Sequence, residues 1–124
     1  MKHQIPNPKH YDLEERTAEF AESIIEIMQK LPNNSINKRM IEQCVGSAGS
    51  IGANYCEANE AESKKDFQHK IGICKKETKE TKHWIRLLAK ANPGFKEDFR
   101  VLWQEAQELL LIFSSIIKSS KNRV

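Results

Sequence analysis

The chain has 124 residues and a formal net charge of +3, with 39% hydrophobic and 30% charged residues. This length and balance fit one globular domain with its own core, and they exclude an intrinsically disordered chain. Three cysteines without a Cys-x-x-Cys motif exclude a disulfide framework and favour buried thiols in a reducing, cytoplasmic compartment. No apolar run approaches the roughly 18 residues of a membrane span, and the N-terminus lacks the apolar segment of a signal peptide.

The first predicted helix covers residues 12–30 and follows an N-terminal arm, residues 1–11, which contains two prolines and is expected to be flexible. Apolar residues recur in this helix at steps of three and four, which places them on one face. Acidic residues repeat on the opposite face and give the segment a net charge of −4. Proline disfavours helical backbone in the residue before it, so Leu31-Pro32 ends the helix.

The second predicted helix covers residues 35–58 and contains Gly46, Gly49 and Gly52. Each glycine inside a helix costs up to about 1 kcal/mol relative to alanine, which suggests compensating contacts. We expect these small residues to let another helix approach closely, with Gly46, Gly49 and Ala53 beside the core stripe. A phosphate-binding loop is the less favoured alternative, because the run lacks a Gly-Lys-Ser/Thr ending and a preceding strand.

The third predicted helix covers residues 63–91, with Ser63 as its N-cap and Asp66 three residues later. Its net charge is +6. Five of its basic residues fall within an arc of roughly 80° and form a line about 22 Å long, which we call the basic ridge. The basic ridge consists of Lys75, Lys79, Lys82, Arg86 and Lys90. It predicts a polyanion-binding surface; the alternative is a solvated face or one paired with the acidic first helix.

The same helix carries two spacings that resemble the Glu-x-x-His motif of di-iron bundles, at Glu80–His83 and at Asp66–His69. The two histidines lie about 21 Å apart along the helix axis, so one metal centre cannot use both. No nucleophile motif accompanies them. We therefore predict no metal, no cofactor and no catalytic residue.

Asn92-Pro93-Gly94 separates the third helix from a fourth, which ends at about residue 118 and leaves a polar tail, residues 119–124. Four amphipathic helices with short connections predict an all-α, up-down-up-down four-helix bundle over residues 12–118. The predicted core consists of Leu13, Thr17, Phe20, Ile24, Met28, Leu31, Ile41, Cys44, Ala48, Ile51, Tyr55, Ala58, Phe67, Ile71, Cys74, Thr78, Thr81, Ile85, Leu88, Phe95, Phe99, Leu102, Ala106, Leu109, Phe113 and Ile116.

Apolar residues also lie outside the core stripes of the last two helices. The interior of one small bundle has too little room for both sets, and an exposed apolar patch of that size favours association. We therefore predict a homo-oligomer. Its expected interface contains Trp84, Leu87, Trp103, Leu110 and Ile117.

The segment Ser50-Ile51-Gly52-Ala53-Asn54-Tyr55-Cys56-Glu57-Ala58 resembles the signature Ser-Ile-Pro-Ala-Asn-Ile-Ala-Glu-Gly of the 23S rRNA intervening-sequence proteins. Ser63-Lys64-Lys65-Asp66-Phe67 and His83-Trp84-Ile85-Arg86-Leu87-Leu88 continue the resemblance, whereas Gly52 and Ala58 depart from the usual proline and glycine. The resemblance implies a four-helix bundle, usually a homopentamer, often encoded inside insertions of 23S rRNA genes. It carries over no catalytic residue.

A related branch, the accessory variability proteins of diversity-generating retroelements, forms a basic pentameric barrel that binds nucleic acid and a reverse transcriptase. The favoured hypothesis is therefore a non-enzymatic, oligomeric RNA- or DNA-binding protein linked to rRNA-gene insertions or a mobile element. The first alternative is a protein-interaction scaffold, and the second is a metalloenzyme. Salt-dependent RNA binding separates the favoured hypothesis from the scaffold, and metal content separates both from the metalloenzyme.

Overall fold

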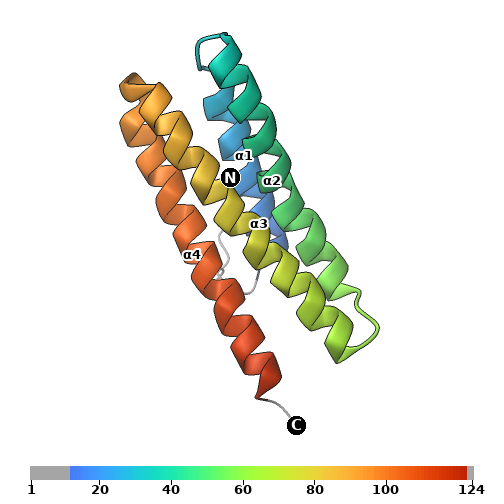
Figure 1. Cartoon of the computed structure of the whole chain (residues 1–124). Helices are drawn as coiled ribbons and strands as arrows, with labels where there is room; N and C mark the ends of the chain where they lie inside the picture. Colours follow the sequence, from blue (N-terminus) through green and yellow to red (C-terminus); the bar gives the residue numbers. More distant parts are fainter. Residues whose placement is uncertain (1–11, 123–124) are drawn as a thin grey trace.

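The computed structural model describes residues 12–122, which form four long helices joined by short connections (Figure 1). α1 spans Leu13–Met28, α2 Ser35–Asn59, α3 Lys64–Ala91 and α4 Lys96–Lys121, and a 3-10 turn, η1, spans Pro93–Phe95. Successive helices run antiparallel, so the predicted all-α, up-down-up-down four-helix bundle is confirmed. α4 continues past the predicted bundle end at residue 118, and the predicted flexible arm, residues 1–11, lies outside the described residues.

Polar side chains cap the starts of α1, α2 and α3. Ser63 Oγ accepts a hydrogen bond of 3.0 Å from the backbone N–H of Asp66, which confirms the N-cap predicted for α3. Asp12 and Asn34 do the same for α1 and α2. A cap satisfies one of the N–H groups that a helix start leaves without an intrahelical partner, so these residues fix where the helices begin.

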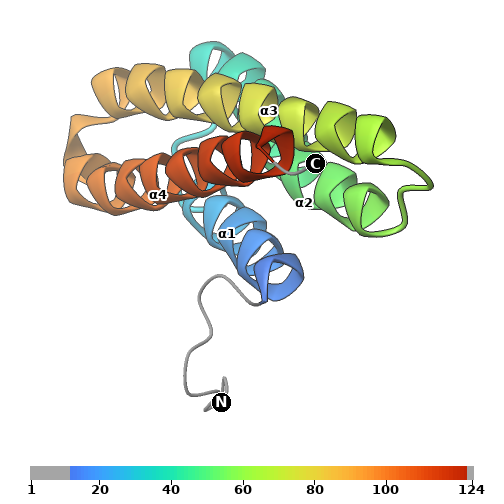
Figure 2. The ribbon, with the colours of Figure 1, turned by 90° about the horizontal axis from the view of Figure 1, so that it is seen from below.

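The core forms along the stripes that the sequence predicts. Every predicted core residue is buried or half-buried, and Ile24, Ile51, Ile71 and Phe113 have no exposed surface. α2 packs along most of α3, and α3 packs along α4, whereas α1 meets α4 over a shorter stretch. Among residues 12–122, no Cα atom of α1 lies within 8 Å of a Cα atom of α3, and the two helices occupy opposite corners of the bundle (Figure 2).

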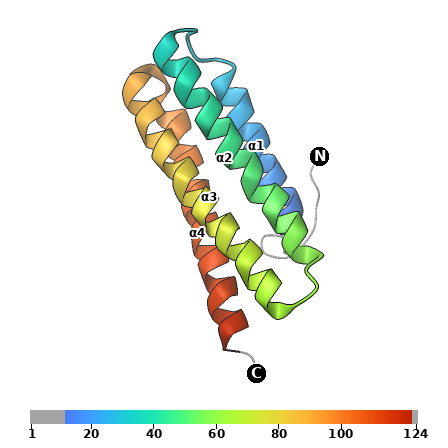
Figure 3. The same ribbon diagram turned by 45° about the vertical axis from the view of Figure 1, so that its right-hand side comes forward.

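Two buried asparagines join the start of α2 to the end of α3, at the same end of the bundle as the α3–α4 turn (Figure 3). The side-chain amides of Asn37 and Asn92 exchange two hydrogen bonds of 2.9 Å. Each amide also donates to a backbone carbonyl, that of Pro32 at 2.8 Å and that of Leu88 at 2.9 Å. Because a buried amide is costly unless it is hydrogen-bonded, this pairing fixes the register of α2 against α3.

The glycines of α2 do not share one role. A Cβ placed on Gly52 would lie 3.0 Å from Thr17 Oγ1, so Gly52 lets α1 approach α2 closely, as predicted for this glycine run. Gly46 and Gly49 would meet nothing within 4 Å, and Ala53 is exposed. The expectation that Gly46 and Gly49 admit a neighbouring helix is therefore wrong within the described chain, because both lie on the outer face of α2.

Replacing Asn92 with alanine should lower the free energy of unfolding by about 1–3 kcal/mol, because the amide of Asn37 is then buried with one partner fewer. Urea denaturation followed by circular dichroism measures this loss. The double variant N37A/N92A should lose less than the sum of the two single variants, since it leaves no orphaned amide. Additive losses would contradict the pairing.

Candidate nucleic-acid interface

The basic ridge lies on the flank of α3 that borders α4. Lys82 Nζ donates a hydrogen bond to Gln107 Oε1 of α4, which fixes the side of α3 on which the ridge stands. Lys75 and Lys82 are half-buried, whereas Lys79, Arg86 and Lys90 are exposed. The five predicted nucleic-acid-binding residues thus follow one edge of the outer groove between α3 and α4.

α4 supplies the opposite edge of this α3/α4 groove. Lys82 Nζ lies 4.3 Å from the centroid of the Trp103 ring, in a cation–π contact. Near the α3–α4 turn the groove opens into a hollow of about 230 Å³, which we call the Trp103 hollow. The hollow is lined by Ile85, Arg86, Ala89, Lys96, Phe99, Arg100 and Trp103.

The basic ridge has no acidic partner within residues 12–122. Within residues 12–122, none of its five side chains forms an ion pair, and only Lys82 forms a side-chain hydrogen bond. The alternative that pairs the ridge with the acidic first helix is wrong for the single subunit, since no ridge side chain forms an ion pair with α1 within residues 12–122. The charges of Lys79, Arg86 and Lys90 therefore face solvent.

The acidic face of α1 lies beside the other flank of α4. Arg16 Nε donates to Glu105 Oε2 at 2.7 Å and Arg16 Nη2 to Glu108 Oε1 at 2.7 Å, so this half-buried arginine links α1 to α4. The hydrogen bond with Glu105 is the main reason that the pKa of Arg16 is raised. A hollow of about 440 Å³ between these helices is lined by Glu19, Glu26 and Asp98 among others. α4 thus separates an acidic flank of the molecule from a basic one.

Four neighbouring carboxylates crowd this acidic flank. The pKa of Glu15 is raised, first by a hydrogen bond with Glu19 and then by desolvation and the negative charges of Glu19, Asp12 and Glu22. Like charges that repel one another make the charged form less favourable. This flank therefore repels polyanions, in contrast to the basic ridge on the other flank of α4.

The structure divides the predicted oligomer interface between two faces. Trp84 and Leu87 lie away from α4, since Trp84 is about 160° around α3 from Lys82. Trp103 lines the α3/α4 groove, and Leu110 and Ile117 are half-buried on α4. Trp84 and Ile117 pack partly against the core, so the bundle interior holds more of these side chains than the sequence indicated.

The groups considered for catalysis have other contacts. Trp84 Nε1 donates to Glu80 Oε2 at 3.1 Å, and the His83 and Trp84 rings lie 5.0 Å apart. Among residues 12–122, no three His, Cys, Asp or Glu side chains form a group that could hold a metal ion. Burial raises the pKa of the Cys44 and Cys74 thiols to about 12. Cys56 is exposed, so the expectation of buried thiols is wrong for this residue.

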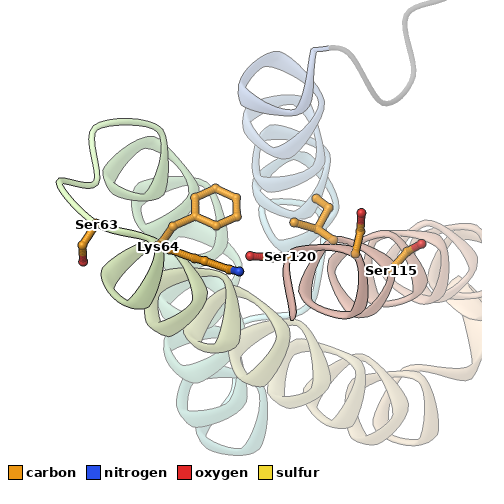
Figure 4. A pocket seen from close by; sticks show the side chains of 7 residues that line it. Ser63, Lys64, Ser115 and Ser120 are labelled. Atoms are coloured by element: carbon orange, nitrogen blue, oxygen red, sulfur yellow. The ribbon is translucent and has the colours of Figure 1, made fainter. Parts of the chain in front are cut away.

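A hollow of about 700 Å³ lies between the start of α3 and the end of α4 (Figure 4). Lys64 reaches across it towards Ser120, while Ser63 and Ser115 stand at its margins. Its lining contains four serines but no histidine, carboxylate or thiol that could serve as a general base beside them. Ser63 already accepts the capping hydrogen bond of α3.

The profile of the 23S rRNA-intervening sequence protein family matches residues 9–115. The chain belongs to this family. A crystal structure of a protein of unknown function from the S23 ribosomal protein family of Bacteroides thetaiotaomicron is similar to it, with 32% sequence identity and a TM-score of 0.74. That similarity covers 85% of this chain and 97% of the other. The comparison with curated proteins gives no match.

The family match confirms the resemblance noted in the Ser50–Ala58 segment and, with the solved structure, the four-helix fold. None of the helices between residues 12 and 122 has the length and hydrophobicity needed to cross a membrane.

Three residues of this intervening-sequence protein line the groove opposite the basic ridge but were not grouped with it from the sequence: Lys96, Arg100 and Trp103. Lys96 and Arg100 lie at the start of α4. The apolar stripe of α4 alone does not tell which neighbouring helix these two side chains face. Trp103 was assigned only to the interface. The i, i+4, i+7 spacing of Lys96, Arg100 and Trp103 places them on one side of α4, which is the signal that could have grouped them.

Proposed function

We propose that this protein is a non-enzymatic nucleic-acid-binding protein that acts as a homo-oligomer and contacts phosphates through the basic ridge. The observation that carries this proposal is that the five ridge side chains form no ion pair within residues 12–122. A charged line with no internal partner is available to a polyanion, and phosphate contacts release counterions from the nucleic acid. Membership of the 23S rRNA-intervening sequence family supports a link to insertions in rRNA genes.

The position of the ridge supports this function further. Lys96 adds positive charge on the opposite edge of the groove, whereas the charge of Arg100 there is balanced by its ion pair with Glu97. That ion pair lowers the pKa of Glu97 through a hydrogen bond from Arg100. One subunit offers few phosphate contacts, so its binding should be weak; a ring that repeats the groove would raise avidity along a strand.

A protein-interaction scaffold remains the second candidate, because exposed apolar side chains occur near the start of α2 and towards the end of α3. Ile36 is 63% exposed and Leu87 is 36% exposed, and the Asn37–Asn92 pair holds their helix ends together. A reverse transcriptase, the protein partner that the retroelement branch implies, belongs with this candidate. We propose that Ile36 and Leu87, which we call the Ile36–Leu87 surface, pack against a different surface of another subunit. A contact between unlike surfaces of this kind can close into a ring.

Neutralising Lys79, Arg86 and Lys90 together with glutamine should weaken binding of an oligo(U) strand. The slope of log affinity against log salt should fall by about 2, since each lost phosphate contact removes about 0.7 for a single strand. Fluorescence anisotropy across a salt series measures both quantities.

The matched control neutralises Lys30, Lys38 and Arg39, which removes the same charge from exposed positions that belong to neither α3 nor α4. It should leave the slope nearly unchanged. Equal losses of oligo(U) affinity in the ridge variant and the control would mean that binding depends only on the net charge of the protein. Unchanged binding in the ridge variant, with the protein folded, would favour the scaffold.

Light scattering at micromolar concentration should give several times the 14.3 kDa mass of one chain. The double variant Ile36→Glu/Leu87→Glu should lower that mass, because it places charges in an apolar contact. Ile25→Glu is the control, since Ile25 is exposed on α1 away from this surface. A wild-type mass of 14.3 kDa would contradict assembly.

A further inference from the structure

The Trp103 hollow combines an apolar floor with a cationic rim. Ile85, Ala89 and Phe99 form part of the floor, and Trp103 remains 38% exposed at its edge. Arg86 and Lys96 stand on the rim, one from each helix, and neither forms an ion pair within residues 12–122. Such a surface suits a ligand that has a flat apolar part and a negative charge beside it.

The basic ridge continues directly from this hollow. Arg86 belongs to both, and Lys82, the next ridge residue towards the α3 start, covers the Trp103 ring with its ammonium group 4.3 Å from the centroid. A strand whose phosphates follow the ridge therefore passes the hollow within reach of one of its bases. Aromatic side chains beside a cationic track bind the bases of single strands without strong sequence preference.

We propose that the Trp103 hollow binds a nucleobase of an unpaired RNA or DNA strand, with Trp103 as the stacking platform and Arg86 and Lys96 at the adjacent phosphates. This inference rests on the proposed function and makes it more specific. The bases of a duplex are paired and stacked inside it, so they cannot enter the hollow unless the duplex opens. The groove should therefore prefer single strands to duplexes of the same length.

The test compares an oligo(U) strand with an RNA duplex of equal length. Trp103→Leu should weaken oligo(U) binding by roughly 5- to 150-fold, the range that loss of one stacked base implies. It removes no charge, so the salt slope and duplex binding should stay unchanged. Val101→Ala is the control, because Val101 is 56% exposed on the flank of α4 that faces α1.

A second readout does not depend on how Trp103→Leu folds. In a Trp84→Phe background Trp103 is the sole tryptophan, and oligo(U) should quench its fluorescence while the duplex should not. Trp103→Phe, which keeps an aromatic ring, should retain most of the oligo(U) affinity.

Oligo(U) binding that depends on the ridge but not on Trp103 would overturn this inference and leave the proposed function standing. Failure of the wild-type protein to bind either nucleic acid would overturn both. A lower oligomer mass for Trp103→Leu, measured by light scattering, would show that a second copy of the chain covers the hollow and would also overturn the inference.

Discussion

α3 packs against both α2 and α4 through one narrow apolar stripe, and the rest of the structure depends on this constraint. The stripe from Ile71 to Leu88 faces inward along the length of the helix. Both flanks of α3 are therefore left at the surface, one beside α2 and one beside α4. The residues of the basic ridge lie next to this stripe on the α4 side. The packing of the stripe, rather than the charge of the ridge, therefore decides that the ridge lies beside α4.

The diagonal placement of α1 and α3 has an electrostatic consequence. In this bundle α2 and α4 lie between the acidic α1 and the basic α3 (Figure 2). The charges of α1 therefore do not pair with the basic ridge of α3 within a subunit. Arg16 is instead used to hold α1 to the acidic flank of α4. A surface with segregated charge keeps a local field even though the chain's net charge is only +3, and that field attracts polyanions to one side.

The periodicity of the sequence was enough to predict the helices, the core stripes and the N-cap at Ser63. It could not predict Asn37 and Asn92 as buried, because a polar residue in a helical pattern counts as surface unless its partner is known. It also could not place Trp103 beside the basic ridge, since that neighbourhood depends on how α4 is rotated against α3. The assignment of Gly46 and Gly49 to close packing failed for the same reason: the face of α2 that meets α1 contains Gly52 instead.

The most direct test of the central claim, that an unneutralised flank of α3 meets the nucleic acid, is lysine footprinting by acetylation and mass spectrometry. Lys79 and Lys90 are exposed on the ridge, while Lys30 and Lys38 are exposed outside α3 and α4. Adding oligo(U) at low salt should protect Lys79 and Lys90 from acetylation and leave Lys30 and Lys38 as reactive as before. Protection of Lys30 and Lys38 with the ridge lysines unprotected would contradict the account.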